Sequence, residues 1–223
     1  MCDGRAAVTA YWRRGVRVKT CARITWMVLT LGVACGPAEG QTPRQLLRQA
    51  ESDFLAGRVE ASVIGFDQVA LVRPDAAPGL WQRGIALYYV GRFEDCRRQF
   101  ESHRLVNPND VENAAWHFLC VAKAEGAEAA LAAILSVGPD SRPPMREIYD
   151  MFSGRLSPQE VLSAAGEVPR ARFYAHLYIA LYHESLGRTG LARDEIVLAA
   201  DDQFAAAGGY MHAVAVVHRD RLE

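Results

Sequence analysis

Cysteine is scarce in this sequence, long apolar runs are absent, and glycine patterns for nucleotide binding are missing. The 223 residues include five cysteines, too few for a small fold held together by disulfide bonds. The longest nearly uninterrupted apolar run spans residues 24–35 and is shorter than the roughly 20 residues that a membrane-spanning helix needs. No phosphate loop and no dinucleotide-binding glycine motif occurs. These absences argue against a disulfide scaffold, a membrane-spanning bundle and the common nucleotide-binding folds.

Charge of either sign is not in excess. The chain has 25 Lys and Arg residues against 26 Asp and Glu residues, and 19 against 24 remain without residues 1–40, for a net charge near −5. Proteins that bind nucleic acid usually carry a basic surface, so nucleic acid is not an expected partner. The content of 50% hydrophobic and 23% charged residues is that of an ordinary globular protein.

Residues 1–40 have the pattern of a secretory signal peptide. Six basic residues come before the apolar run, and Gly, Ala and Pro follow it. Ala34, Ala38 and Gly40 each have a small residue two places earlier, so cleavage after any of them fits the pattern. The sequence therefore predicts a leader over residues 1–40 and an exported, periplasmic domain over residues 41–223. A buried N-terminal helix is the alternative interpretation.

Cys35 raises the question of a lipid anchor. A lipid on a new N-terminal cysteine would hold the protein at the outer membrane, and no other membrane contact is expected. A bacterial lipoprotein signal usually has a large aliphatic residue three places before the cysteine, where this chain has Gly32. Cys35 is therefore a tentative lipid-attachment residue, and simple cleavage without lipid is the alternative.

Two further cysteines, Cys96 and Cys120, remain after any cleavage. An oxidising compartment would allow them to pair. Both lie within helical patterns at positions that face neighbouring helices, where a small apolar residue is common. The sequence favours two small buried residues and leaves a disulfide open.

A repeat is the most informative feature of the chain. Four residue pairs are separated by 34 positions: Ala50 and Gly84, Gly57 and Gly91, Phe66 and Phe100, Pro74 and Pro108. In each copy one helix would end at the glycine, a second would begin three residues later, and the proline would stop it. The spacing predicts an all-α fold of helical hairpins with small residues where two helices approach closely.

This unit resembles the tetratricopeptide repeat (TPR), which implies a short right-handed superhelix. Two regular repeats cover residues 43–76 and 77–110, and a degenerate one without the glycine turn covers residues 111–136. An inserted helix pair is expected over residues 145–166, with Ser157 as N-cap, Pro158 as first helical residue and Glu160 closing a capping box. A further repeat over residues 173–200 and a capping helix over residues 210–222, covering the open apolar end of the stack, complete the array.

The order of these units resembles the NlpI-type periplasmic lipoproteins over residues 43–222. The inserted pair Glu147–Leu162, followed by Phe173-Tyr174 through Leu186-Gly187, is the more distinctive part of the likeness. The resemblance implies a non-catalytic scaffold or adaptor that recruits proteases or cell-wall hydrolases, often as a homodimer, and needs no cofactor. The alternatives are a structural component of an outer-membrane or cell-division assembly and, less favoured, an enzyme of an unfamiliar helical type.

The motifs that point to catalysis or metal binding are incomplete. His183-Glu184 begins like a zinc-protease motif, but Gly187 stands where the second histidine is needed. Ser185 lacks the preceding glycine and strand of a nucleophile elbow. His176 and His183 lie two helical turns apart without a third ligand at suitable spacing. The sequence therefore predicts neither a catalytic residue nor a metal site, and gives these histidines a packing or surface role.

A partner-binding groove is expected on the first helices of the first two repeats, which line the concave side of a TPR stack. The residues assigned to it are Leu47, Glu51, Phe54, Leu55, Trp81, Ile85, Tyr88 and Tyr89. In the second repeat, spacings of three and four place the aromatic side chains on one helical stripe. Such a groove suits an apolar peptide or a helix of a protein partner. The alternative is that a neighbouring helix or the second copy of a homodimer buries some of these rings.

Overall fold

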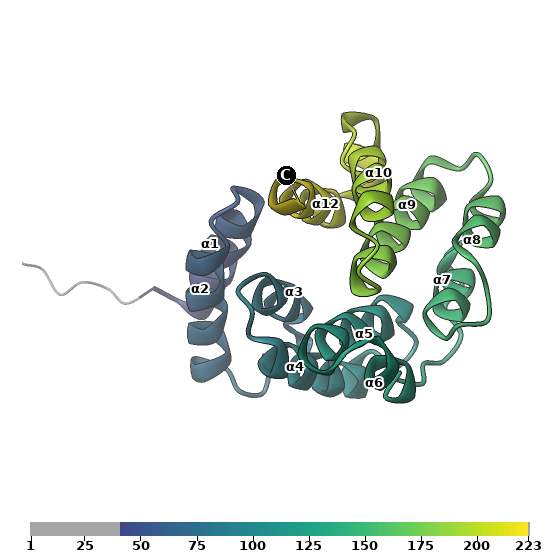
Figure 1. Ribbon diagram of the computed structural model, residues 1–223. Coiled ribbons are helices and arrows are strands. Elements are labelled where there is room, and N and C mark those ends of the chain that lie inside the picture. The colour runs from purple at the N-terminus through teal and green to yellow at the C-terminus, as the bar shows by residue number, and fades with distance from the viewer. Residues whose placement is uncertain (1–40, 223) are drawn as a thin grey trace, which may run out of the picture. The chain divides into compact units, whose positions relative to one another are not determined.

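The computed structural model describes residues 41–222, which are all-helical, as predicted, and contain no strand (Figure 1). The first two hairpins are α1 (Pro43–Leu55) with α2 (Val59–Val72), and α3 (Trp81–Tyr89) with α4 (Phe93–Val106), joined by the short helix η1 (Ala77–Gly79). Next come α5 (Val111–Glu125), α6 (Ala127–Ala132), α7 (Met145–Phe152) and α8 (Pro158–Ala165). The chain ends with α9 (Pro169–Ser185), α10 (Thr189–Ala199), η2 (Asp202–Phe204), α11 (Ala205–Gly208) and α12 (Tyr210–Leu222). The predicted signal peptide and Cys35 lie outside the described residues.

A Gly-Arg dipeptide makes the turn in four of the hairpins. The glycines Gly57, Gly91, Gly154 and Gly187 have φ values of 74°, 76°, 72° and 71°. This left-handed conformation is favourable for glycine and ends a helix. The arginine that follows donates its backbone N–H to a carbonyl five residues earlier, at 2.8 to 3.0 Å in all four turns. The sequence comparison found three of these glycines and missed the arginine that accompanies each.

The third hairpin also turns at a glycine, contrary to the expectation for residues 111–136. Gly126 has a φ of 97° and is the only residue between α5 and α6. It lies 35 positions after Gly91, so a comparison at a constant spacing of 34 passes over it. The inserted pair α7 and α8 has the predicted capping box, in which the Ser157 backbone donates to Glu160 Oε2 at 2.7 Å.

Cys96 and Cys120 form a disulfide, so the favoured expectation of two unpaired cysteines was wrong. Cys96 lies on α4 and Cys120 on α5, and their Cα atoms are 5.9 Å apart. Both residues are also buried, as expected. The sequence placed each cysteine on a face toward a neighbouring helix, but only the packing of α4 against α5 shows that they face each other.

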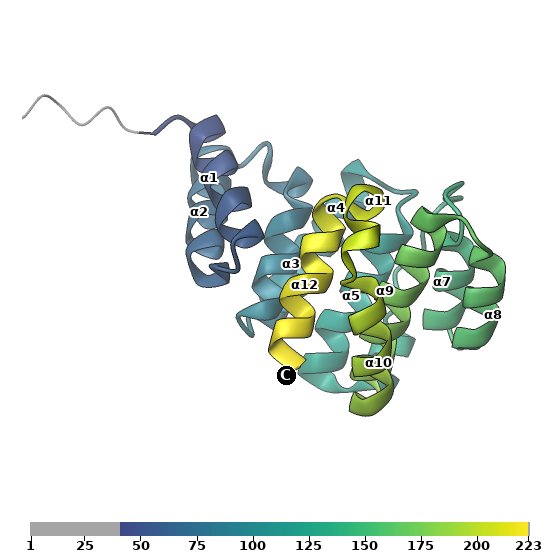
Figure 2. The ribbon, with the colours of Figure 1, turned by 90° about the horizontal axis from the view of Figure 1, so that it is seen from above.

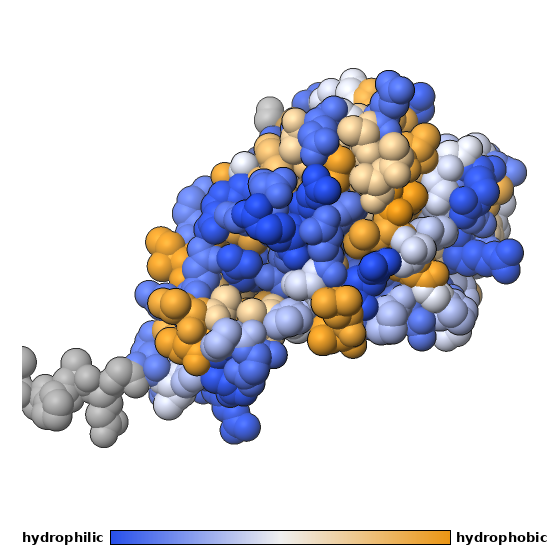
Figure 3. All heavy atoms as spheres, turned by 90° about the horizontal axis from the view of Figure 1, so that it is seen from below, coloured by the Kyte–Doolittle hydropathy of each residue, from blue (hydrophilic) through white to orange (hydrophobic). Residues whose placement is uncertain are grey.

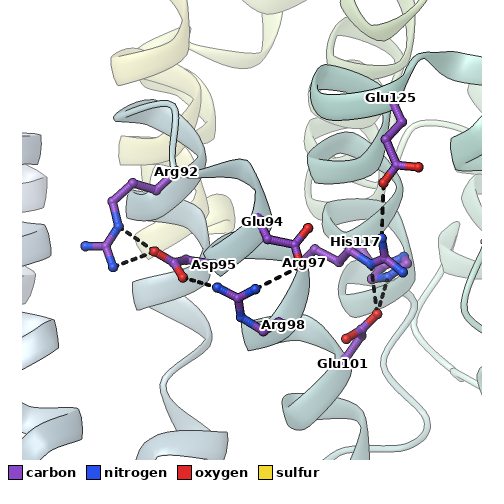
Figure 4. A network of polar contacts seen from close by, with 8 residues as sticks. All are labelled: Arg92, Glu94, Asp95, Arg97, Arg98, Glu101, His117 and Glu125. Carbon is purple, nitrogen blue, oxygen red and sulfur yellow. Dashed lines mark hydrogen bonds and ion pairs between the residues drawn. The ribbon is translucent and has the colours of Figure 1, made fainter.

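Charged residues join the outer surfaces of the same two helices (Figure 4). Arg97 of α4 bonds Glu101 one turn later at 3.0 Å and reaches Glu125 of α5 at 3.1 Å. His117 of α5 lies 3.4 Å from the Glu101 carboxylate, and burial lowers the pKa of this histidine. Exposed ion pairs contribute little to stability individually, so the disulfide and the apolar contacts hold this helix pair.

Small residues permit close helix packing, as the repeat predicts. A Cβ atom on Gly84 would lie 2.7 Å from two ring atoms of Phe100, and a Cβ on Gly65 would lie 2.9 Å from the Cβ of Ala50. Larger side chains at these places would separate the helices of the hairpins.

The last helix, α12, packs against the final hairpin, as a capping helix would, and it also lies on the inner side of the array. It packs against α10 and reaches α1, and it lies between these helices in Figure 1 and beside α3 in Figure 2. Its buried residues lie on more than one face of the helix and are Met211, His212, Val214, Ala215, Val217 and His218. A helix that is apolar on most sides needs surrounding partners, and the inner side of the array supplies them.

Candidate functional site

The residues assigned to the groove divide into a buried and an accessible set. Phe54 and Ile85 are 0% exposed, and Tyr88 and Tyr89 are 5% and 8% exposed. Leu55, in contrast, is 53% exposed. The other three, Leu47, Glu51 and Trp81, are half-buried. The structure therefore places half of the predicted groove residues in the core.

Helix α12 occupies the groove that the sequence assigned to a partner. The ring of Tyr210 stacks on Phe54 with centroids 5.4 Å apart and meets Trp81 edge-on at 5.2 Å. At the other end of the helix, a hydrogen bond of 3.2 Å joins the Tyr89 hydroxyl to His218 Nδ1. The structure favours the alternative interpretation of the aromatic stripe, because a helix more than a hundred residues later in the chain covers part of it.

A cluster of charged and polar side chains fixes the C-terminal end of α12. Glu184 of α9 accepts hydrogen bonds from Tyr88 at 3.2 Å and from Lys123 at 2.7 Å. His218 Nε2 lies 3.3 Å from the same carboxylate, and Arg221 donates to the backbone carbonyl of Tyr89 at 2.7 Å. Helices α3, α5, α9 and α12 thus meet at one carboxylate.

Burial sets the protonation states in this cluster. It lowers the pKa of His218 to about 4, against the opposing effect of Glu184. It also raises the pKa of Tyr88 and of Tyr89 well above the usual value. At neutral pH the histidine is therefore uncharged and both phenols are protonated.

A cleft remains between the C-terminal end of α1 and the outer side of α12. Its volume is about 370 Å³, and its lining residues are Leu55, Ala56, Gly57, His212, Ala213, Val216, Val217 and Asp220. Leu55 is thus the predicted groove residue that is still exposed and lines an open surface. Most of the lining is apolar or small, with Asp220 and His212 at its polar positions.

A second cavity, of about 310 Å³, lies on the inner side of the array. It is lined by Trp81, Ile85, Phe100, His103, Asp110, Glu112, Asn113, Trp116, Arg142, Tyr174, Gly208, Tyr210 and Met211. These residues come from α3, α4, α5, α9, α11, α12 and two loops. Two predicted groove residues, Trp81 and Ile85, belong to it, but sequence reasoning did not identify the others as site residues.

Arg142 closes one side of this cavity in an ion-pair network. Its guanidinium bonds Asp110 at 2.6 Å, Glu112 at 2.7 Å and Asp140 at 2.5 Å. Burial and the Asp110 charge raise the pKa of Glu112, which also accepts a hydrogen bond of 2.7 Å from Tyr178. Three carboxylates surround one guanidinium, so the network has a net negative charge when they are ionised.

The histidines of α9 have packing roles in the described structure. His176 is buried and bonds Glu195 at 2.6 Å, and burial lowers the pKa of the equally buried His183. Ser185 donates its hydroxyl to the carbonyl of Tyr182 at 2.7 Å. No group of three His, Cys, Asp or Glu residues within residues 41–222 is arranged to hold a metal ion.

Four exposed apolar residues occupy equivalent positions in the first two hairpins. Leu71 and Val72 end α2, and Leu105 and Val106 end α4, with Leu71 and Leu105 81% and 77% exposed. The pairs are 34 residues apart, a signal that the sequence analysis did not use. Figure 3 shows that the lower side of the molecule in Figure 1 has separate apolar spots around a broad hydrophilic area.

No protein-family model matches the chain, and comparison with curated proteins gives no match. Among the helices of residues 41–222, none has both the length and the apolar character needed to cross a membrane.

Proposed function

We propose that the chain is a non-catalytic, TPR-like adaptor of a bacterial cell envelope that binds a protein partner. The repeated hairpins with Gly-Arg turns and small residues at helix crossings support the repeat assignment. The seating of α12 on the aromatic residues of α1 and α3 supports a groove that accepts an apolar helix. A partner of the protease or cell-wall hydrolase type follows from the NlpI-type resemblance.

The partner docks at the cleft between α1 and α12, and this cleft is the observation that carries the proposal. Leu55 is half-exposed there beside Val216 and Val217, and the neighbouring Ala56, Gly57 and Ala213 leave room for larger side chains. Exposed apolar residues in a concave surface are typical of helix-in-groove recognition. Asp220 at the edge of the cleft suits a basic residue on the partner.

Export to an oxidising compartment is part of the proposal. The basic and apolar pattern of residues 1–40 supports it, and so does the Cys96–Cys120 disulfide, because disulfides persist mainly outside the cytosol. A lipid on Cys35 would hold the adaptor at the membrane surface and leave residues 41–223 free to meet a partner.

A site-specific photo-crosslinker tests this function in envelope preparations. We expect a crosslinker at Leu55 to capture a protease or cell-wall hydrolase, identified by mass spectrometry. The control position is Leu191 on α10, which is 50% exposed against 53% for Leu55 and lies outside the cleft. Equal capture from both positions would argue against the cleft, and capture of assembly machinery from Leu55 would favour the structural alternative.

A further inference from the structure

Leu71 and Leu105 are the two most exposed large apolar residues within residues 41–222, at 81% and 77%. Each is followed by an exposed valine, Val72 or Val106, and none of the four lines either cavity described above. Single exposed apolar residues are common on protein surfaces. A Leu-Val pair that recurs at the same place in two successive hairpins indicates a surface that is buried against another molecule.

The first pair lies at the edge of the array where the described chain begins. Gly65 of α2 lies against Ala50 of α1, and a turn of three residues joins these two helices. Because the helices are antiparallel, Leu71, six residues after Gly65, is level with Arg44, six residues before Ala50. The end of α2 and the start of α1 are therefore neighbours.

The connection that follows α2 brings the second pair to the same edge. The carbonyl of Pro78 lies 2.9 Å from Nδ1 of His103 on α4, and the carbonyl of Ala77 accepts a hydrogen bond of 2.9 Å from Gln99. Leu105 comes two residues after His103. The ends of α2 and α4 thus lie on the two sides of this short connection.

The distance to the possible lipid anchor is short at this edge. Six residues separate Cys35 from Gln41, the first described residue, and an extended chain of that length spans at most about 20 Å. Gln41 comes two residues before the start of α1. A lipid on Cys35 would therefore keep this edge, more than any other part of the array, close to a bilayer.

The polar residues of the edge suit phosphate groups. Arg44 is exposed, and Arg104, next to Leu105, is half-buried and donates to the carbonyl of Ser136 at 3.4 Å. Guanidinium groups bind phosphate with two parallel hydrogen bonds. The acidic residues that follow the two apolar pairs already have arginine partners: Asp75 is paired with Arg73, and Asp110 with Arg142.

A protein surface is a poorer match for this edge. Protein interfaces are enriched in aromatic residues and methionine, whereas the exposed pairs consist of leucine and valine. Aliphatic side chains that enter the acyl region, with arginines that keep their charge at the headgroups, are typical of proteins that lie on a membrane.

We propose that this edge lies on a phospholipid bilayer, an inference that rests on the proposed location in the cell envelope. The aliphatic side chains enter the boundary between headgroups and acyl chains, and the arginines bind lipid phosphates. The residues in contact are Leu71, Val72, Leu105, Val106, Arg44 and Arg104. Leu55 is eleven residues after Arg44 on the same helix, about 16 Å along its axis. The contact therefore orients the domain so that the cleft between α1 and α12 faces away from the bilayer.

Binding of the full chain to vesicles tests the proposal. Co-sedimentation with phosphatidylethanolamine vesicles, with and without phosphatidylglycerol, compares the wild type with the double variant Leu71→Gln and Leu105→Gln. We expect the partition coefficient of the variant to fall on the order of tenfold, because glutamine removes apolar area without changing the charge. Both residues are exposed, so the melting temperature should not change.

The matched control is the double variant Leu55→Gln and Leu191→Gln. These leucines are 53% and 50% exposed and lie beside hairpin turns, away from the ends of α2 and α4. The control should bind vesicles like the wild type. All three proteins contain residues 1–40, so the contribution of that segment to binding is the same in each.

Leu105→Trp reports the contact at the edge itself. Trp12→Phe and Trp26→Phe in the same chain leave Trp81 and Trp116 as the other fluorophores, and both are at least half-buried. We expect vesicles to shift the emission of the residue 105 indole to shorter wavelength, and lipids with brominated acyl chains to quench it. Leu191→Trp in the same background should show neither effect.

Two results would overturn the proposal. One is equal vesicle binding by both double variants together with no quenching at residue 105 by brominated lipid. The other is an emission shift at residue 105 that needs no vesicles and grows with protein concentration, because a second copy of the chain would then cover the edge. Neither result affects photo-crosslinking from Leu55, so failure of this inference is distinct from failure of the proposed function.

Discussion

Phe54→Ala should lower the free energy of unfolding by about 3 to 5 kcal/mol, the usual cost of truncating a fully buried aromatic residue. The Phe54 ring is 0% exposed and stacks on Tyr210 of α12. It also lies 6.0 Å from the ring of Tyr89. The substitution therefore leaves a cavity between α1, α3 and α12 that the surrounding helices cannot fill without moving. Urea denaturation followed by circular dichroism measures the loss.

Leu55→Ala is the matched control, because it is the next residue on the same helix and was assigned to the same groove. Its side chain is 53% exposed, so the expected change in unfolding free energy is within about 0.5 kcal/mol. Partner capture should instead weaken, because the apolar contact in the α1–α12 cleft is lost. Similar stability losses in both variants would mean that α12 does not bury Phe54 as described.

Acidification should destabilise the fold through His218. The pKa of this buried histidine is about 4 in the folded chain, against 6.5 for an unperturbed histidine. Between these two pH values the unfolded chain therefore binds more protons than the folded chain. The stability that the uncharged His218 contributes is present above about pH 6.5 and is lost as the pH falls toward 4. This difference in pKa corresponds to a loss of about 3 kcal/mol in the free energy of unfolding between pH 7 and pH 4. Glu184 opposes the shift, and Lys123 and Arg221 reinforce it.

His218→Gln isolates this contribution from the rest of the titration. Burial also lowers the pKa of His117 and His183, so the wild type alone does not identify the responsible residue. The variant cannot become charged, and its unfolding free energy should fall much less than that of the wild type over the same pH range. Parallel pH profiles for both proteins would contradict the assignment to His218.

Local sequence signals predicted the helices well, because their causes lie within a few residues. Gly57 and Gly91 end helices through backbone conformation, and Ser157 begins one through a hydrogen bond to the third residue of the helix. A constant spacing extends such signals to the next repeat. A comparison at constant spacing misses a turn when one residue is inserted before it, as at Gly126. It also misses residue types that are left out of the comparison, such as the arginine after each glycine.

The candidate sites depend on contacts between distant parts of the chain, and the sequence does not contain their geometry. Trp81 and Tyr89 have the composition and spacing of a binding stripe, but Tyr210 and His218 contact them only because the array curves back on itself. Leu71 and Leu105 have the spacing of the repeat, but only the structure shows that both side chains are exposed.

The seating of α12 on the inner side of α1 and α3 is the central claim, because both the docking cleft and the cavity depend on it. Hydrogen–deuterium exchange with mass spectrometry measures it directly on the full chain. If α12 is packed as described, the amides of residues 210–222 should exchange as slowly as those of α3 at neutral pH, and Phe54→Ala should accelerate both segments together. Exchange of residues 210–222 within seconds, while α3 stays protected, would contradict the account.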